Sequence, residues 1–219
     1  MTTDKVDAEW GIPADAGRIL LPIARAAITR ALGQPGRTIE STEDIDDAKD
    51  AKDAKDAVGA EGAEGAVWLQ QPGACFVTLT QQHQLRGCIG SLEAYQSLLD
   101  DVESNAVAAA LRDHRFKPLS RAELVLTQIE VSVLSPMQAM HFESEAQALA
   151  QLRPGVDGVV FQYGRYRSTF LPQVWEQLPD VHQFMAHLKQ KAGLPLDFWH
   201  AGVQLLRYSV RKWQEQGAS

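Results

Sequence analysis

The chain has 219 residues, of which 45% are hydrophobic and 22% are charged, and its formal net charge is −7. This composition is typical of a globular protein, and no apolar run reaches the roughly 18 residues that a membrane-spanning helix needs. Residues 1–10 are polar and acidic, unlike a secretory signal. We therefore expect a cytoplasmic protein that does not bind membranes.

The negative charge is concentrated at the front of the chain. Residues 1–66 hold 14 acidic and 8 basic side chains, whereas residues 67–219 hold 14 and 13. Neither part carries a basic stripe that could follow a phosphate backbone, so nucleic acid is not an expected partner. The two cysteines, Cys75 and Cys88, are expected to be free thiols. A redox pair would require their Cβ atoms to lie close together on neighbouring strands.

The first predicted element is a helix over residues 14–32, preceded by an N-terminal tail over residues 1–13. Pro22 lies inside the helical pattern and predicts a kink or a late start, and Gly33 is a plausible end. Residues 40–66 contain Ala-Lys-Asp and Ala-Glu-Gly repeats with almost no large apolar side chain. This low-complexity stretch predicts a disordered insertion that interrupts a domain over residues 14–214.

From residue 66 onward the periodicity alternates between strands and helices. Helical spacing of apolar residues predicts three further helices, over residues 95–112, 144–152 and 181–192. Alternating or continuous apolar runs predict strands, namely a hairpin over 74–80 and 84–90, a strand over 124–134, a hairpin over 159–163 and 166–171, and a closing strand over 203–213. Antiparallel strands with interspersed helices indicate an α+β fold.

The most informative stretch is Leu85-Arg86-Gly87-Cys88-Ile89-Gly90. In an extended strand Leu85 and Ile89 would point into a core, while Arg86 and Cys88 would lie side by side on the other face. A guanidinium beside a thiol favours the reactive thiolate. Gly87 and Gly90 remove side-chain bulk, so a backbone or a small molecule can approach closely.

Each candidate residue also has a purely structural interpretation. Cys88 is either a reactive thiol or a small buried hydrophobic residue. Arg86 either binds an anionic ligand or forms a salt bridge, for instance to Glu130 or Asp113. Asp113 and Arg115 either bind a ligand or fix the turn after the helix.

A cysteine nucleophile needs a base, and the nearest histidines in the sequence are His83 and His114. The spacing His83-x4-Cys88 is not that of a known metal site, and no Cys-x2-Cys or His-x3-His is present, so no metal ligands are predicted. The sequence does not identify a cofactor.

Four stretches, residues 75–79, 85–91, 113–119 and 129–134, resemble the AMMECR domain family, known in prokaryotes as AmmeMemoRadiSam system protein A. The resemblance runs from about residue 14 to residue 214. It implies a compact α+β fold with an antiparallel or mixed sheet, packed helices and a smaller subdomain. Where the family usually has proline, this chain has His114, and the family usually lacks the insertion over 40–66. Because the family requires no histidine at position 114, the resemblance argues against a papain-like triad.

The resemblance also implies partners, because prokaryotic members are associated with a Memo-like protein and a radical SAM protein. We expect a pocket formed by Arg86, Gly87, Cys88 and Gly90, with walls from Asp113, Arg115, Phe116 and Glu130. The enzymatic hypothesis has Cys88 act on a small anionic substrate that Arg86 holds. The alternatives are a non-catalytic binding or adaptor module for those partners, and a motif that only maintains the fold.

Overall fold

The computed structural model describes residues 11–33 and 66–216, and the structural statements below concern these residues. The chain divides into two compact units, Met1–Val133 with Lys212–Ser219, and Leu134–Arg211. We call them the first and the second unit. The predicted N-terminal tail over 1–13 is described only from Gly11 onward. The predicted insertion over 40–66 lies outside the described residues except for Ala66, which is buried.

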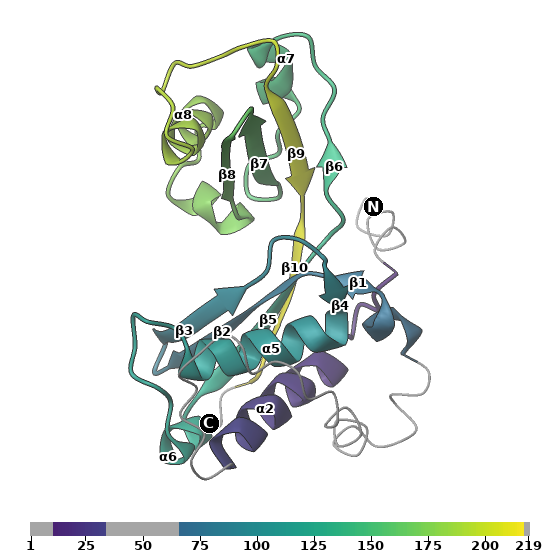
Figure 1. Cartoon of the computed structure of the whole chain (residues 1–219), viewed down its shortest axis with the longest axis vertical. Helices are drawn as coiled ribbons and strands as arrows, with labels where there is room; N and C mark the ends of the chain where they lie inside the picture. The colour runs from purple at the N-terminus through teal and green to yellow at the C-terminus, as the bar shows by residue number, and fades with distance from the viewer. Residues whose placement is uncertain (1–10, 34–65, 217–219) are drawn as a thin grey trace. The chain divides into compact units, whose positions relative to one another are not determined.

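The first unit is built on a four-stranded sheet with the strand order β10-β5-β2-β3. Its helices are α2, α5 and α6, and Figure 1 shows α5 along one face of the sheet with α2 beside it. The bounds are α2 Gly17–Gly33, η2 Val67–Gln70, β1 Pro72–Gly73, β2 Cys75–Gln81, β3 Gln84–Gly90, β4 Gln96–Ser97, α5 Leu98–Leu111, α6 Arg121–Val125, β5 Gln128–Leu134 and β10 Val210–Gln214.

Alternation along β2 and β5 separates the two faces of this sheet. Cys75, Val77 and Leu79 are fully buried toward α5, and so are the equivalent apolar residues of β5. The residues between them, such as Thr78 and Glu130, point away from α5 and are partly exposed. We call the side opposite α5 the outer face.

Local sequence signals explain where α5 begins and which of its sides is buried. The Ser97 hydroxyl accepts a hydrogen bond from the Asp100 amide at 3.1 Å, which caps the helix. Asp100 and Asp101 lie in the first turn, where the helix dipole favours negative charge. Val102 and Ala106 form part of the predicted buried stripe. The helix expected over 95–112 is thus confirmed, with a shorter N-terminal end.

Two predictions of strands need correction. The first two residues of the strand expected over 124–134 belong instead to α6, because Ser120 and Glu123 make a reciprocal capping box that starts a helix at Arg121. The closing strand expected over 203–213 is two strands in different sheets, β9 and β10, which meet at Ser209. The Ser209 oxygen accepts a hydrogen bond from the Ser135 amide, and the Ser209 amide donates to the Ser135 hydroxyl. The partner of Ser209 is thus a residue that belongs to neither sheet.

The hairpin predicted around residues 81–83 is confirmed. Gln82 and His83 both have positive φ, at 49° and 63°. A two-residue connection with positive φ at both positions matches the right-handed twist of the strands that it joins. Pro22 lies within α2, which continues on both sides of it.

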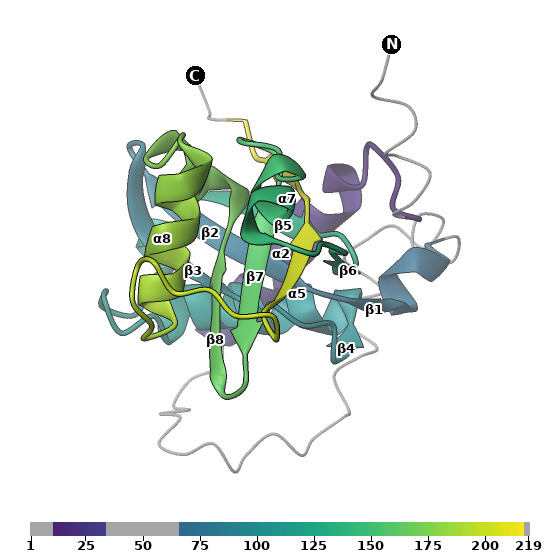
Figure 2. The same ribbon diagram turned by 90° about the horizontal axis from the view of Figure 1, so that it is seen from above.

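The second unit contains another antiparallel four-stranded sheet, with the order β6-β9-β7-β8. Helices α7 and α8 contribute to its core, and Figure 2 shows α8 beside β8. Trp175 stacks on Phe184 in this core, with ring centroids 3.7 Å apart. The bounds are β6 Gln138–Ala139, α7 Glu145–Ala150, β7 Gly158–Tyr163, β8 Tyr166–Phe170, η3 Pro172–Glu176, α8 Val181–Lys191 and β9 Gln204–Tyr208.

Gly87 provides a test of how tightly β3 packs on α5. A Cβ atom at this position would lie 2.2 Å from the backbone oxygen of Ala109 on α5. Because a backbone oxygen cannot move aside as a side chain can, we expect Gly87→Ala to destabilise the protein by about 1–3 kcal/mol. Urea unfolding followed by circular dichroism would measure this loss.

Gly202→Ala is the control, because the nearest neighbour of a Cβ there would be the flexible His200 side chain at 3.3 Å. Equal unfolding midpoints for the two variants would contradict the close helix–strand contact.

Candidate functional site

The motif strand β3 contains a β-bulge that overturns one of the sequence predictions. In the pairing with β2, Leu79 is opposite Gly87 and Thr80 is opposite Leu85, so Arg86 is the extra residue. A bulge changes the face to which the preceding side chains point. Leu85 was expected in the core, but it shares the outer face with Thr80 and is 44% exposed. Ile89, beyond the bulge, packs against the core as predicted.

The bulge residue Arg86 forms its salt bridge with Glu123 of α6. Its Nη2 atom lies 3.1 Å from the Glu123 Oε1 atom, and its Nε atom also donates to this oxygen. The predicted salt-bridge partners, Glu130 and Asp113, are therefore replaced by Glu123. Hydrogen bonds from the Ser120 backbone and hydroxyl and then from Arg86 lower the pKa of Glu123. Arg86 thus connects the bulge to the capped end of α6 and is 14% exposed.

Cys88 lies on the outer face and is partly exposed. Its sulfur accepts a hydrogen bond from the Thr78 hydroxyl at 3.3 Å. Thr78 is the strand partner of Cys88 on one side and of Glu130 on the other. These three side chains form a row across β3, β2 and β5. Two strand spacings separate the ends of the row by about 10 Å.

The far end of the row is an ionic contact. Glu130 accepts a hydrogen bond from the Ser132 hydroxyl at 3.3 Å, and the Lys212 ammonium lies 3.8 Å from its Oε2 atom. The Glu130 side chain is 23% exposed, so it is accessible from the outer face. The polar row consists of Cys88, Thr78, Glu130 and Lys212, and we keep this name below.

Asp113 connects the end of α5 to the motif. Its buried carboxylate accepts the backbone N–H of Cys88 at 2.9 Å and two hydrogen bonds from the Arg115 guanidinium, at 2.9 and 2.6 Å. The hydrogen bond from Arg115, followed by that from the Cys88 amide, holds the pKa of Asp113 well below its usual range. Arg115 also donates to the backbone oxygen of Cys88 at 3.2 Å. Asp113 and Arg115 therefore fix the position of Cys88 as well as the turn.

The two glycines accept close neighbours from within the protein. At Gly87 the neighbour is the α5 backbone, and at Gly90 it is the Phe76 ring, 2.3 Å from the position that a Cβ would take. The space that the missing side chains leave is thus filled by protein atoms at both positions. Phe116 is partly exposed and lies against the Arg115 guanidinium, 5.4 Å from its ring centroid.

The loop after α5 carries two unpaired cations, Arg112 and Lys117, with His114 between them in the sequence. All three side chains are exposed, and among the described residues they have no hydrogen bond or ion pair. Asp113 in the same loop is neutralised by Arg115. The loop therefore presents positive charge, and its hydrogen bonds to the Cys88 backbone hold it next to the motif.

The two cysteines point to opposite faces of the sheet. Cys75 is fully buried on the side of α5, where burial raises the pKa of its thiol well above the usual value. Cys88 lies on the outer face, and both are free thiols. In this arrangement the two sulfurs do not form a redox pair.

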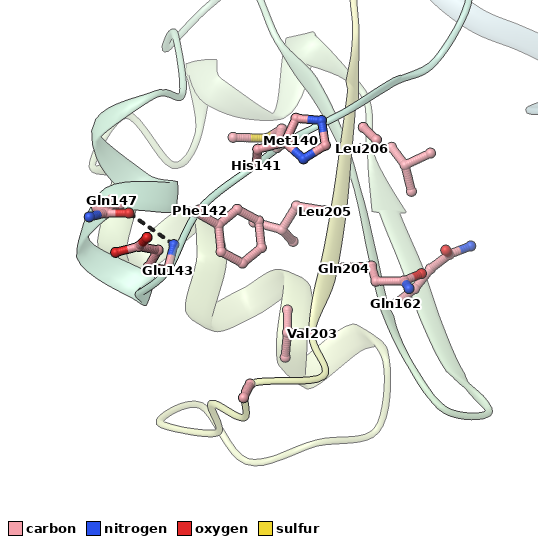
Figure 3. Close-up of a pocket in the computed structure, with 12 residues that line it drawn as sticks. Met140, His141, Phe142, Glu143, Gln147, Gln162, Val203, Gln204, Leu205 and Leu206 are labelled. Carbon is pink, nitrogen blue, oxygen red and sulfur yellow. Dashed lines mark hydrogen bonds between the residues drawn. The ribbon is translucent and has the colours of Figure 1, made fainter.

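A separate groove of about 780 Å³ lies in the second unit (Figure 3). Its lining includes Phe142, Glu143, Gln162, Gln204 and Leu205, and none of the residues predicted for the site. Within the described part of the chain, no group of three or more His, Cys, Asp and Glu side chains is placed to hold a metal ion. Among the helices described there, none is both long and apolar enough to cross a membrane.

The fold and the motif together define a class of α+β protein with two antiparallel four-stranded sheets and an Arg-Gly-Cys strand clamped to a helix end. The AMMECR1 family model matches residues 23–213. The chain belongs to this family, which confirms the resemblance found in the sequence.

Archaeal relatives and a solved structure agree with this assignment. A protein of Methanothermobacter thermautotrophicus is 34% identical over 205 residues, covering 93% of this chain and 96% of that protein. A protein of Methanocaldococcus jannaschii is 38% identical over 145 residues, covering 64% of this chain and 72% of that protein. The crystal structure of an uncharacterized protein from Pyrococcus horikoshii is similar with a TM-score of 0.71 and 27% identity, and the match covers 95% of each chain.

Sequence reasoning missed two residues of this site. Thr78 donates to the Cys88 sulfur, and its position could have been found by assuming the hairpin register. Glu123 pairs with Arg86, and the signal for it was the spacing Ser120-x-x-Glu123, which is that of a capping box.

Asp113 accepts hydrogen bonds from the Cys88 amide and from Arg115, and we call this contact the clamp. It predicts that the stability difference between the wild-type protein and a variant without the Asp113 charge depends on pH. Because the pKa of Asp113 is lowered by folding, its carboxylate stabilises the fold above its unfolded-state pKa of about 3.9, and this stabilisation is lost as pH falls through the folded-state value. We expect Asp113→Asn to cost about 2 kcal/mol at neutral pH, with a decreasing difference from wild type below about pH 4. Urea unfolding at several pH values measures this.

Asp197→Asn serves as the control, since Asp197 is exposed and its side chain has no hydrogen bond or ion pair with another described residue. A loss for Asp113→Asn that stays constant down to the lowest pH would contradict the ionic clamp.

Proposed function

We propose that this protein carries out thiol-dependent chemistry on a small anionic compound at Cys88. In this proposal it acts in the cytoplasm, in a pathway shared with a Memo-like protein and a radical SAM protein. In its simplest form, the Cys88 sulfur bonds to an electrophilic carbon of the compound and the bond from that carbon to its leaving group breaks. The leaving group keeps the electron pair, and the thiol proton passes to solvent.

The observation that carries this proposal is the position of the Cys88 sulfur. It is partly exposed on the outer face and accepts a hydrogen bond from Thr78. The clamp from Asp113 holds its backbone amide. A nucleophile benefits from such fixed positioning, because orientation lowers the entropic part of the barrier. The amide of Cys75 is held in the same way, by Asp101 at 2.8 Å, but its sulfur is sealed in the core.

The charge around Cys88 supports an anionic compound. Arg112 and Lys117 are exposed in the loop that binds the Cys88 backbone, and their charges are not neutralised within the described residues. Arg86, which the sequence suggested as the anion-binding group, is already paired with Glu123. In the proposal the loop cations therefore take over the role first given to Arg86, and Glu130 lies two strands away from Cys88 in the polar row.

Two alkylating agents of similar size, one neutral and one anionic, test this proposal. We expect native protein to react at Cys88 and not at Cys75, with iodoacetamide and with the anionic iodoacetate. Replacing both Arg112 and Lys117 by glutamine should lower the iodoacetate rate relative to the iodoacetamide rate by about two- to fivefold, because each nearby surface charge contributes modestly. Mass spectrometry of the two cysteine peptides measures both rates.

Arg18→Gln is the control, because Arg18 is an exposed cation on α2, which lies on the α5 side of the sheet. If Cys88 stays unmodified in the folded protein, the thiol chemistry is refuted. If Cys88 reacts but replacing Arg112 and Lys117 leaves the ratio of the iodoacetate rate to the iodoacetamide rate unchanged, the preference for an anionic compound is refuted.

A second candidate function, an adaptor for the same partners, has an observation of its own. Val125 and Leu126 at the end of α6 are 82% and 73% exposed, and Leu85 on the bulged strand is 44% exposed. The Arg86–Glu123 salt bridge joins these two segments. Exposed apolar residues in adjoining segments are typical of protein-binding surfaces.

The adaptor function predicts that a charge at this surface abolishes partner binding without changing the thiol. We expect Leu126→Asp to prevent co-purification with the radical SAM or Memo-like protein encoded in the same organism, while Cys88→Ser retains it. Tyr95→Asp, another exposed apolar residue that lies before α5, is the control. Retention by Leu126→Asp would exclude this surface.

A further inference from the structure

The groove of the second unit forms where two paired strands separate. At its closed end, β6 pairs with β9, and the Met140 amide donates to the Leu205 oxygen at 2.9 Å. After Met140 the chain turns away toward α7, whereas β9 continues back through Gln204 to Val203 (Figure 3). The groove is lined by both diverging segments. Its volume of about 780 Å³ lies in the range of small-molecule sites.

The middle of the groove is apolar. Met140, Val203 and Leu205 are buried and form its floor. Phe142 lies beside Leu205 in Figure 3, and its ring contacts that of Trp199, with ring centroids 5.7 Å apart. A half-buried aromatic ring over an aliphatic floor offers contact to a flat or extended apolar group.

Polar groups without protein partners lie at two places on the rim. On one side, Gln162 and Gln204 are strand partners of β7 and β9, and their amides lie together in Figure 3. On the other side, the Glu143 amide donates to the Gln147 side chain at 2.9 Å, which fixes the backbone there. Among the described residues, the Glu143 carboxylate and the two glutamine amides have no hydrogen bond or ion pair.

The charge of the lining selects the kind of ligand. Among the described residues that line the groove, Glu143 is the only carboxylate, His141 is the only other titratable side chain, and none is a lysine or an arginine. An anionic ligand would therefore meet an unpaired carboxylate and no cation, whereas an ammonium group would gain an ion pair with Glu143 and contact with the Phe142 ring.

From these contacts we infer that the groove binds small organic amines. The ammonium group pairs with Glu143, the apolar body lies on Leu205 beside Phe142, and a hydroxyl or amide at the other end bonds to Gln162 and Gln204. This site is independent of Cys88 and of the function proposed above. It takes a ligand of the opposite charge.

Three compounds of nearly equal size test this inference by isothermal titration calorimetry on the whole chain. Tyramine carries an ammonium and a hydroxyl, phenethylamine lacks the hydroxyl, and 3-(4-hydroxyphenyl)propionate replaces the ammonium by a carboxylate. We expect tyramine to bind most tightly and the carboxylate not to bind. Glu143→Gln should weaken tyramine about three- to tenfold. Gln204→Leu should remove the preference for tyramine over phenethylamine.

Glu176→Gln is the matched control, because Glu176 is an exposed carboxylate outside the groove. Circular dichroism establishes that each variant is folded. Binding of the propionate as tightly as tyramine, or unchanged tyramine affinity in Glu143→Gln, would overturn the inference. Absence of tyramine binding to the wild-type protein up to millimolar concentration would overturn it as well.

Discussion

The contact between α5 and the β2–β3 hairpin positions the candidate site in the first unit. Two aspartates, one near each end of α5, fix the hairpin to the helix by hydrogen bonds. Asp101 accepts the backbone N–H of Cys75 at 2.8 Å, and Asp113 accepts that of Cys88 at 2.9 Å. Gly87 lets the strand approach the helix backbone between them. A buried carboxylate that receives such hydrogen bonds is stable only while its donors stay in place.

This contact explains why the conspicuous residues of the motif have unequal roles. The helix side of the hairpin uses Gly87 and Cys75 for packing, and Asp101 and Asn105 complete a buried polar network there. The outer face is left with Cys88, Thr78 and Glu130, and the described helices of the first unit pack on the opposite face. Because α5 holds the strand from one side, reactive or binding groups on the other side are fixed without being buried.

Positive and negative binding features are kept in separate units. Among the described residues, Arg112 and Lys117 present unpaired positive charge in the first unit, and Glu143 presents an unpaired carboxylate in the groove of the second. Each unit thus has a feature suited to a ligand of a different charge, at the sites proposed above.

The sequence by itself determined the α+β class, the hairpins, the main helices and the family, because these depend on local periodicity and on a contiguous motif. It also placed Asp113 and Arg115 at a turn. Only the tertiary structure decided that a bulge moves Leu85 to the outer face, that Arg86 pairs with Glu123, and that residues 203–213 serve two sheets. Register and partner choice depend on groups far apart in the chain, so the local pattern of residues 84–90 predicted neither the bulge nor the partner of Arg86.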